Sequence, residues 1–330
     1  FDGCLCTNTK RFLHNNIDSL VHVLNNSKNF KNRFVIIDGV YSQDGDIAFL
    51  DQIYAVCKEH DAFLIVDDAH GIGVLGKTGR GIIEDYGLLD KVDMITGTFS
   101  KAFGCVGGYA IARKEIITLL RYYSRQNIFS AAATPQTAAS AIKAIQLIDQ
   151  EPQWRNTLAE NIEYFKTGLE TLGLDYGNTE SAIFPVMVRN EHNVKEAARI
   201  LFEQGIYVNP ISYPAVPEKL SRLRFSLTAM HTKEELDKTF SILENIKDHL
   251  LYPCFSIPVF FYRSHGDFRC QLIREVEFPG RDAAEGHAAQ TVDCRHIEAG
   301  AVTACQQFPV CFCNGARNNW AHGVQHTAAR

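Results

Sequence analysis

Short runs of apolar residues recur along the first third of the chain, separated by turns and by stretches with helical spacing. Residues 34–38 and 62–67 are continuous apolar runs that both end on an aspartate, and residues 48–60 between them have helical spacing. Residues 92–96 are a third strand candidate, and residues 106–112 are a fourth that returns along the sheet. Apolar strands that alternate with helices predict an α/β fold whose sheet is covered on both faces.

A second pattern begins after Pro135. Two long helical stretches come first, and strand-like and helical segments then alternate to residue 249, which predicts a smaller α+β domain. The helical segments are 136–149, 154–172, 193–204 and 232–249, and the strand-like segments are 182–188, 206–209 and 222–228.

The last part of the chain differs from the rest in hydrophobic pattern and in composition. Residues 253–330 carry no sustained helical or alternating pattern and are rich in Cys, His, Arg and Gly. These residues raise a zinc-binding interpretation, but the paired C-x-x-C spacing of structural zinc sites is missing. We therefore expect no metal site, and expect residues 251–330 to be a disordered tail or sequence unrelated to the fold. The zinc ligands considered are Cys294, His296, Cys305, Cys311 and Cys313.

Composition narrows the class of protein. The 330 residues are 46% hydrophobic and 22% charged with a formal net charge of −5, which is typical of a globular protein and does not favour nucleic acid as a partner. No apolar run approaches the roughly 20 residues that span a bilayer, and no signal-peptide pattern is visible. The scattered cysteines of the first 250 residues suit a reducing compartment, so we expect a cytoplasmic location.

Polar side chains with catalytic potential follow the predicted strands. Asp67 closes the run 62–67, and His70 comes three residues later in the turn. In open α/β sheets ligands bind beyond the carboxyl ends of the strands, and a carboxylate there can hold a cationic ring nitrogen. Taken alone, the aspartate could equally cap a turn and the histidine could pack locally.

A lysine occupies the corresponding place after the third strand. Lys101 is preceded by Thr98 and Ser100 and followed by glycine at 104, so hydroxyls that can bind phosphate oxygens flank a candidate nucleophilic amine. Ser42, in the turn after the first strand, could also face a ligand, although a surface turn is an equally good interpretation. A carboxylate, an imidazole and a hydroxyl-flanked lysine are the groups that pyridoxal 5'-phosphate (PLP) requires.

Three segments carry a family resemblance. Asp-Gly-Val-Tyr-Ser-Gln-Asp-Gly-Asp at 38–46, Val-Asp-Asp-Ala-His-Gly-Ile-Gly-Val-Leu-Gly at 66–76 and Gly-Thr-Phe-Ser-Lys-Ala-Phe-Gly at 97–104 resemble the α-oxoamine synthase family. The resemblance covers about residues 1–250. It implies an α/β, fold-type I PLP-dependent transferase, similar to aspartate aminotransferase: a large mixed-sheet PLP-binding domain (1–150, partial) and a small α+β domain (151–250). Family members carry a further N-terminal segment, with a histidine that stacks on the cofactor, so we expect that part to be missing.

The resemblance also implies roles for individual residues. Lys101 resembles the lysine that binds PLP as a Schiff base, and Asp67 the partner of the pyridine nitrogen. His70 and Ser42 should lie near the phenolic oxygen of the cofactor, and Thr98 resembles a phosphate ligand. Arg224 resembles the arginine that binds the carboxylate of the amino-acid substrate; the alternative is a surface strand arginine, since charged strand residues usually face water.

The activity implied is the decarboxylative condensation of an amino acid (serine, alanine or glycine) with an acyl-CoA, in a homodimer. Residues 205–210, 213–217 and 178–186 look most like serine palmitoyltransferase, which we favour, whereas 100–104 and 69–74 look closer to 8-amino-7-oxononanoate synthase. A 2-amino-3-ketobutyrate CoA ligase is a further member of the same family. Three other hypotheses remain open: an incomplete or structural subunit, a PLP aminotransferase, and a metal-binding module in the tail.

Overall fold

The computed structural model divides the chain into two units, Phe1–Pro253 and Cys254–Arg330. It describes residues 8–247, 250, 260–264, 267–271 and 291–292. Each unit is treated by itself below.

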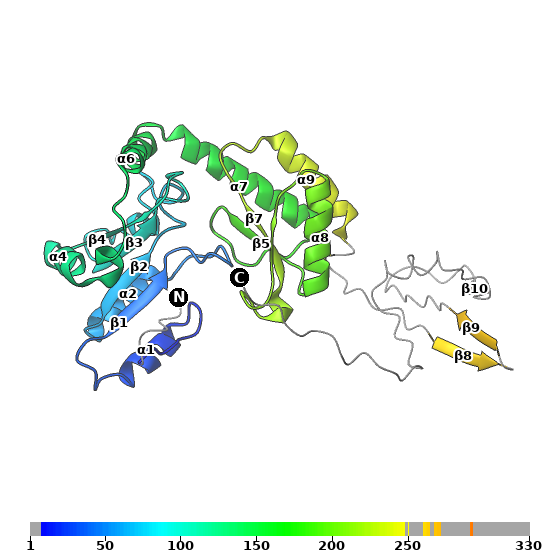
Figure 1. Cartoon of the computed structure of the whole chain (residues 1–330), viewed down its shortest axis with the longest axis horizontal. Coiled ribbons are helices and arrows are strands. Elements are labelled where there is room, and N and C mark those ends of the chain that lie inside the picture. Colours follow the sequence, from blue (N-terminus) through cyan, green and yellow to red (C-terminus); the bar gives the residue numbers. More distant parts are fainter. Residues whose placement is uncertain (1–7, 248–249, 251–259, 265–266, 272–290, 293–330) are drawn as a thin grey trace, which may run out of the picture. The chain divides into compact units, whose positions relative to one another are not determined.

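The first unit contains a four-stranded sheet of order β1-β2-β3-β4 (Figure 1). The strands are β1 (Phe34–Asp38), β2 (Phe63–Asp67), β3 (Met94–Thr98) and β4 (Gly108–Ala112). The first three are parallel and β4 is antiparallel to β3, which confirms the expected mixed sheet with a returning fourth strand. Parallel pairing brings the carboxyl ends of β1, β2 and β3 to one edge of the sheet.

Three helices accompany these strands: α1 (Ile17–Asn25), α2 (Leu50–Glu59) and α3 (Ile82–Asp85). Val35 and Ile37 of β1 are buried in the same hydrophobic cluster as apolar residues of α1 and α2. The alternate residues of β1 are not: Phe34 is 60% and Ile36 is 50% exposed. The expectation of a sheet covered on both faces is therefore wrong for β1 within the described residues, because these helices supply apolar partners to only one of its faces.

A helical segment follows β4 and leads into the second sheet. It contains α4 (Lys114–Tyr123), α5 (Arg125–Ile128), α6 (Pro135–Gln150) and α7 (Gln153–Leu172). The sequence predicts α6 and α7, and the Thr134 hydroxyl caps α6 by accepting a hydrogen bond from the backbone N–H at 137. Helices α4 and α5 are missing from the sequence-based prediction.

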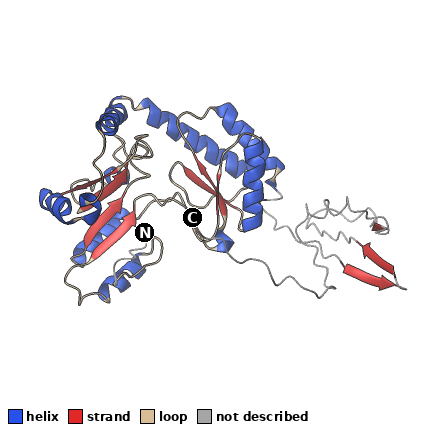
Figure 2. Cartoon of the chain, viewed as in Figure 1, coloured by secondary structure: helices blue, strands red, loops and turns tan. Residues whose placement is uncertain are grey.

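The second sheet has three antiparallel strands in the order β5-β7-β6. Phe165 of α7 packs edge-on against Phe184 of β5, with ring centroids 5.1 Å apart, so α7 lies on this sheet (Figure 2). The predicted small α+β arrangement is present. Its elements are β5 (Ile183–Met187), α8 (Glu191–Glu203), β6 (Asn209–Ile211), the 3-10 helix η1 (Glu218–Leu220), β7 (Arg222–Ser226) and α9 (Lys233–Asn245).

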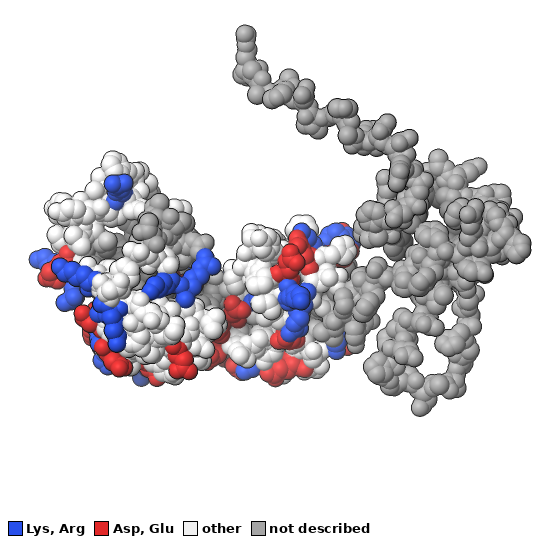
Figure 3. Space-filling view, turned by 90° about the horizontal axis from the view of Figure 1, so that it is seen from below, with Lys and Arg blue, Asp and Glu red and all other residues white. Residues whose placement is uncertain are grey.

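In the second unit the structure describes β8 (Phe260–Ser264), β9 (Asp267–Gln271) and β10 (Thr291–Val292), in the order β10-β9-β8. The zinc ligands considered above, and most of the expected disordered tail, lie outside the described residues. Within the described residues no three His, Cys, Asp or Glu side chains are grouped as metal ligands, and no helix is long and apolar enough to cross a membrane. Basic and acidic side chains share the face of the described chain seen in Figure 3.

Candidate active site

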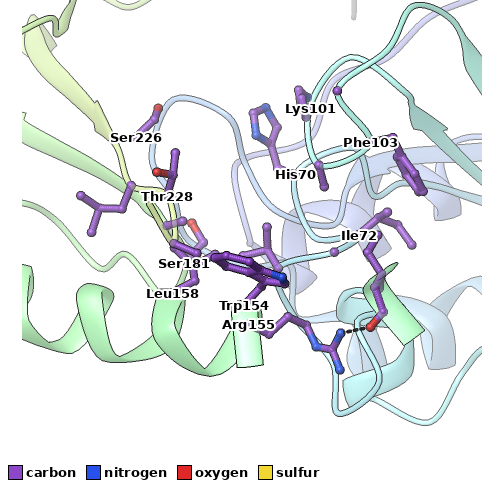
Figure 4. A pocket seen from close by; sticks show the side chains of 18 of the residues that line it. His70, Ile72, Lys101, Phe103, Trp154, Arg155, Leu158, Ser181, Ser226 and Thr228 are labelled. Carbon is purple, nitrogen blue, oxygen red and sulfur yellow. Dashed lines mark hydrogen bonds between the residues drawn. The ribbon is translucent and has the colours of Figure 1, made fainter. Parts of the chain in front are cut away.

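One cavity of about 750 Å³ lies where the loops after β2 and β3 face α6, α7 and the second sheet. His70, Lys101 and Arg224 all line it, although they come from three separate parts of the sequence. His70 and Lys101 lie next to one another in Figure 4, and Ser226 and Thr228 face them from the second sheet. Asp67, Ser42, Thr98 and Ser100 are not part of the lining.

Asp67 ends β2 in register with Asp38 of β1 and Thr96 of β3. One carboxylate oxygen accepts the backbone N–H of Ala69 at 3.0 Å, and the other accepts the Thr96 hydroxyl at 3.1 Å. These two bonds fix the orientation of the carboxylate at the carboxyl edge of the sheet. Each oxygen keeps a second lone pair for a further donor.

His70 follows in the turn after β2 and is half-buried. Burial lowers the pKa of its imidazole to about 4, and the positive charges of Lys101 and Arg224 act in the same direction. Lys101 and Arg224 both lower the pKa of His70, as expected for three residues that line the same cavity. His70 is therefore neutral at pH 7 and can offer one ring nitrogen as donor and the other as acceptor.

Lys101 lies in the turn that follows β3. Partial burial lowers the pKa of its amine, and the charge of Arg224 lowers it further, while Asp67 and Asp38 oppose the shift. A lowered pKa increases the fraction of unprotonated amine, the form that attacks carbonyl carbon or accepts a proton.

Thr98 and Ser100 form a pair of hydroxyls beside this lysine. Their oxygens are 2.8 Å apart, and the Thr98 hydroxyl also donates to the carbonyl of Gly107 and accepts the N–H of Ser100. Thr98 thereby shapes the turn that presents Lys101. The hydroxyl of Ser100 is exposed and able to meet an anionic group.

Arg224 is half-buried on β7, so its interpretation as an ordinary surface strand residue is wrong. Its Nε donates to the backbone carbonyl of Ser42, and its Nη1 donates to the Ser226 hydroxyl at 3.0 Å. Burial lowers the pKa of the guanidinium. Ser42 therefore contributes its carbonyl group to the site, whereas its hydroxyl is 3.5 Å from the Gln43 side-chain amide.

The sequence alone did not identify the apolar wall of the cavity. Trp154, Arg155 and Leu158 of α7 lie on the side of the cavity away from Lys101 (Figure 4). Helical spacing predicts α6 and α7 but not which of their faces lines a site. The larger aliphatic and aromatic side chains of the lining are Ile72, Val74, Phe103, Leu147, Ile148, Trp154, Leu158, Ile183 and Leu227.

Asp68, next to Asp67, is a second carboxyl group whose burial the sequence did not predict. Its side chain is fully buried, and its Oδ2 accepts the backbone N–H of Ile82 at 2.9 Å. Burial raises its pKa to about 8. A Cβ atom at Gly71 or Gly81 would overlap the carboxyl group, which explains the glycines that surround it. Asp68 thus fixes the loop that carries His70.

The chain is similar in sequence to known proteins. A family model described as aminotransferase class I and II matches residues 6–243. The 8-amino-7-oxononanoate synthase of Thermosipho melanesiensis is 38% identical over 247 residues, which are 74% of this chain and 63% of that protein. The serine palmitoyltransferase of Sphingobacterium spiritivorum is 38% identical over 228 residues, 69% of this chain and 57% of that protein.

The chain is also similar to solved structures of serine palmitoyltransferase. Sphingomonas wittichii serine palmitoyltransferase superposes with a TM-score of 0.70 at 33% identity, covering 75% of this chain and 63% of that one. A structure of serine palmitoyltransferase with its PLP internal aldimine gives a TM-score of 0.71 at 32% identity, covering 75% and 64%. The chain thus spans less than two thirds of the length of these relatives.

Proposed function

The chain belongs to the class I and II aminotransferase family and is a homologue of α-oxoamine synthases, and from this premise we propose that it is a PLP-dependent C-acyltransferase. The proposed reaction joins an amino acid to an acyl-CoA and releases CoA and CO₂. The observation that carries the proposal is the shared cavity of Lys101, His70 and Arg224, which adjoins an apolar wall.

The residues present fit PLP. A primary amine of lowered pKa and a neutral imidazole line a cavity of about 750 Å³, and a fixed carboxylate lies at the adjacent strand end. In the proposed arrangement Lys101 would bind the aldehyde carbon and Asp67 would hold the protonated ring nitrogen. His70 and Ser42 would hold the phenolic oxygen, and Thr98 and Ser100 would hold the phosphate. When bound, PLP supplies the electron sink for the bond-breaking steps.

The side chains of this chain divide the remaining work. Arg224 binds the carboxylate of the amino acid through a charge-assisted hydrogen bond, and burial strengthens this contact. Once the amine of the amino acid has taken its place on the cofactor, the freed amine of Lys101 would accept the proton from the α-carbon of the amino acid, as a general base. His70 is neutral at pH 7. It therefore adds no positive charge that would disfavour a proton on the ring nitrogen of the cofactor.

The acyl donor is assigned to the apolar wall. Ile72 and Phe103 come from the loops that carry His70 and Lys101, while Leu147, Ile148 and Leu158 come from α6 and α7. Covering apolar surface with an acyl chain stabilises the complex by about 25 cal/mol for each Å² that is removed from water. A hydrocarbon chain whose thioester lies beside Lys101 therefore fits this wall. We favour serine and a long-chain acyl-CoA as the substrates, as in serine palmitoyltransferase.

A second candidate is 8-amino-7-oxononanoate synthase activity. Several of the most similar curated relatives carry that name, at 37–40% identity. The two activities differ in both substrates, since the second uses alanine and a pimeloyl thioester whose chain ends in a carboxylate. A substrate panel therefore separates them.

We also propose that the active form is a homodimer in the cytoplasm. The support is a set of exposed apolar side chains on neighbouring helices: Leu119, Tyr122 and Tyr123 of α4 and Ile128 of α5, followed by Phe129. Monomeric proteins rarely leave a contiguous apolar patch of this kind uncovered. Light scattering on the purified protein tests the dimer, and a monomer at micromolar concentration would contradict it.

The proposed activity is tested with purified, PLP-loaded protein. Serine with palmitoyl-CoA and alanine with pimeloyl-CoA are supplied in parallel, and free CoA and the condensed amine are quantified by mass spectrometry. The first pair is expected to give the larger yield. A higher yield from the second pair would favour the second candidate, and keto-acid formation without CoA release would favour an aminotransferase.

A further inference from the structure

Two arginines on β7 have very different environments. Arg222 and Arg224 are two residues apart and therefore project from the same side of the strand. Arg224 lines the cavity, whereas Arg222 is only 2% exposed. A cation buried to this degree requires polar partners to offset its lost hydration.

The partners of Arg222 belong to the turn that follows β1. Its Nη1 forms an ion pair with Asp44 at 2.5 Å and donates to the carbonyl of Gln43 at 3.0 Å. Its Nε donates to the carbonyl of Leu220 at 2.9 Å, which anchors the guanidinium at the start of β7. Arg222 therefore ties the second sheet to the backbone at 43–44.

Other buried groups hold the same turn from the same side. The carbonyl of Gly45 accepts the hydroxyls of Thr179 at 3.1 Å and Ser181 at 2.8 Å. Gly45 has a φ of 74°, and a Cβ atom there would overlap the carbonyl of Ile183. The turn at 42–45 is consequently fixed by several contacts with the second sheet.

The fixed turn bears directly on Arg224. The Ser42 carbonyl, at the start of the turn, accepts the Nε of Arg224. This bond sets the plane of the guanidinium, and among the described residues its Nη2 has no hydrogen-bond partner. A guanidinium held at Nε and with Nη2 available is prepared to bind a carboxylate.

We propose that Arg222 is a positioning residue: together with Asp44 it holds the 42–45 turn so that the Ser42 carbonyl orients Arg224 toward the carboxylate of the amino-acid substrate. The inference rests on the proposed function of Arg224. Arg222 touches no substrate itself. Its removal should weaken recognition of the carboxylate and leave recognition of the amine unchanged.

Three substitutions test this from both sides of the contact. Arg222→Lys keeps the buried charge but loses the planar fork, Asp44→Asn removes the paired charge, and Gly45→Ala displaces the turn without altering either arginine. Arg189→Lys is the matched control, because Arg189 forms an exposed ion pair with Asp175 near the same sheet. Thermal unfolding first confirms that each variant is folded.

The first readout is the affinity of the PLP-loaded protein for L-serine and for ethanolamine, which lacks the carboxylate, measured by spectral titration. The three variants are expected to bind serine about tenfold more weakly, with ethanolamine binding and the Arg189→Lys control unchanged; tenfold corresponds to about 1.4 kcal/mol. Unchanged serine affinity, or an equal loss for both ligands, would overturn the proposal.

The second readout needs no cofactor. The amides of Asp44 and Gly45 donate to the Tyr41 carbonyl at 3.3 and 2.8 Å, so hydrogen exchange reports the order of the turn. Faster exchange of these amides in Arg222→Lys supports the proposal, and exchange equal to that of the unsubstituted chain contradicts it. If the PLP-loaded spectrum is absent from the unsubstituted chain, the proposed function fails, while the exchange experiment still tests the role of Arg222.

Discussion

Asp67, the last residue of β2, lies beside Thr96 in the middle of β3, and the Thr96 hydroxyl donates to the Asp67 carboxylate at 3.1 Å. This bond and the N–H of Ala69 orient the carboxylate that we assign to the cofactor ring nitrogen. The strand register therefore supplies a second residue of the site that no motif identified.

Substitution of Asp67 should lower the condensation rate more than substitution of Thr96. Asp67→Asn removes the charge and is expected to lower the condensation rate by more than a hundredfold. Thr96→Val removes one hydrogen bond to a charged group but leaves the charge and the bond from Ala69, so a loss of about 1.5 kcal/mol, or about tenfold, is expected. Steady-state kinetics with saturating PLP measure both, and a Thr96→Val loss as large as that of Asp67→Asn would refute the assigned order.

His70 should remain neutral across the physiological range. Because burial and the neighbouring cations lower its pKa to about 4, it gains a proton only in acid, and its loss of charge is complete well below pH 6.5. Histidine NMR spectra recorded from pH 4 to 8, with His70→Gln used to assign the signal, measure the titration. A midpoint near 6.5 would show that the imidazole is hydrated rather than buried beside Lys101 and Arg224.

Asp68 should make stability fall as pH rises. Its folded-state pKa of about 8 exceeds the ordinary value of 3.8, so between these limits the folded state holds a proton that the unfolded state has released. The free energy of unfolding therefore decreases with rising pH and stops changing above about 8. His70, with a lowered pKa, acts in the opposite direction below pH 6.5.

Between pH 6.5 and 8 two groups lower the stability as pH rises: Asp68, and His14, whose pKa is raised by its hydrogen bond to Asp46. Urea unfolding without PLP should show a decline over this window that is smaller in Asp68→Asn, and the difference between the two proteins measures the Asp68 effect. An identical decline in both proteins would mean that Asp68 is ionised in the folded state.

Gly81 and Gly87 offer a matched pair for testing the packing around Asp68. Both have left-handed backbones, with φ of 79° and 62°, but a Cβ at Gly81 would overlap the Asp68 carboxyl group, whereas one at Gly87 meets nothing within 4 Å. Gly87→Ala should cost about 1–2 kcal/mol of backbone strain. Gly81→Ala should cost several kcal/mol more, and equal unfolding free energies would contradict the described packing.

The sequence predicts the strand ends that carry the polar site residues, but not the apolar residues that line the cavity. Continuous apolar runs predict β1, β2 and β3, and polar residues at their ends predict that Asp67, His70 and Lys101 lie near one edge. This inference succeeds because parallel strands align their carboxyl ends, so short local patterns determine a long-range arrangement.

Other features depend on packing between distant segments. Arg222 and Arg224 look alike in sequence, and only the position of the turn at 42–45 makes one a buried anchor and the other a cavity residue. Helices α4 and α5 have no described buried side chain, so their apolar residues give no indication of a core. The face of α7 that meets the cavity is likewise set by tertiary contacts.

The central claim, that Lys101 is the residue that binds PLP, is tested most directly by one spectrum. Purified protein is titrated with PLP, and the visible absorbance band is recorded for the unsubstituted chain and for Lys101→Ala. A second control is Lys114→Ala, at the start of α4 and outside the cavity lining. The account predicts a band in the unsubstituted chain and in Lys114→Ala that shifts when serine is added and is absent from Lys101→Ala. A band of equal strength in Lys101→Ala would contradict it.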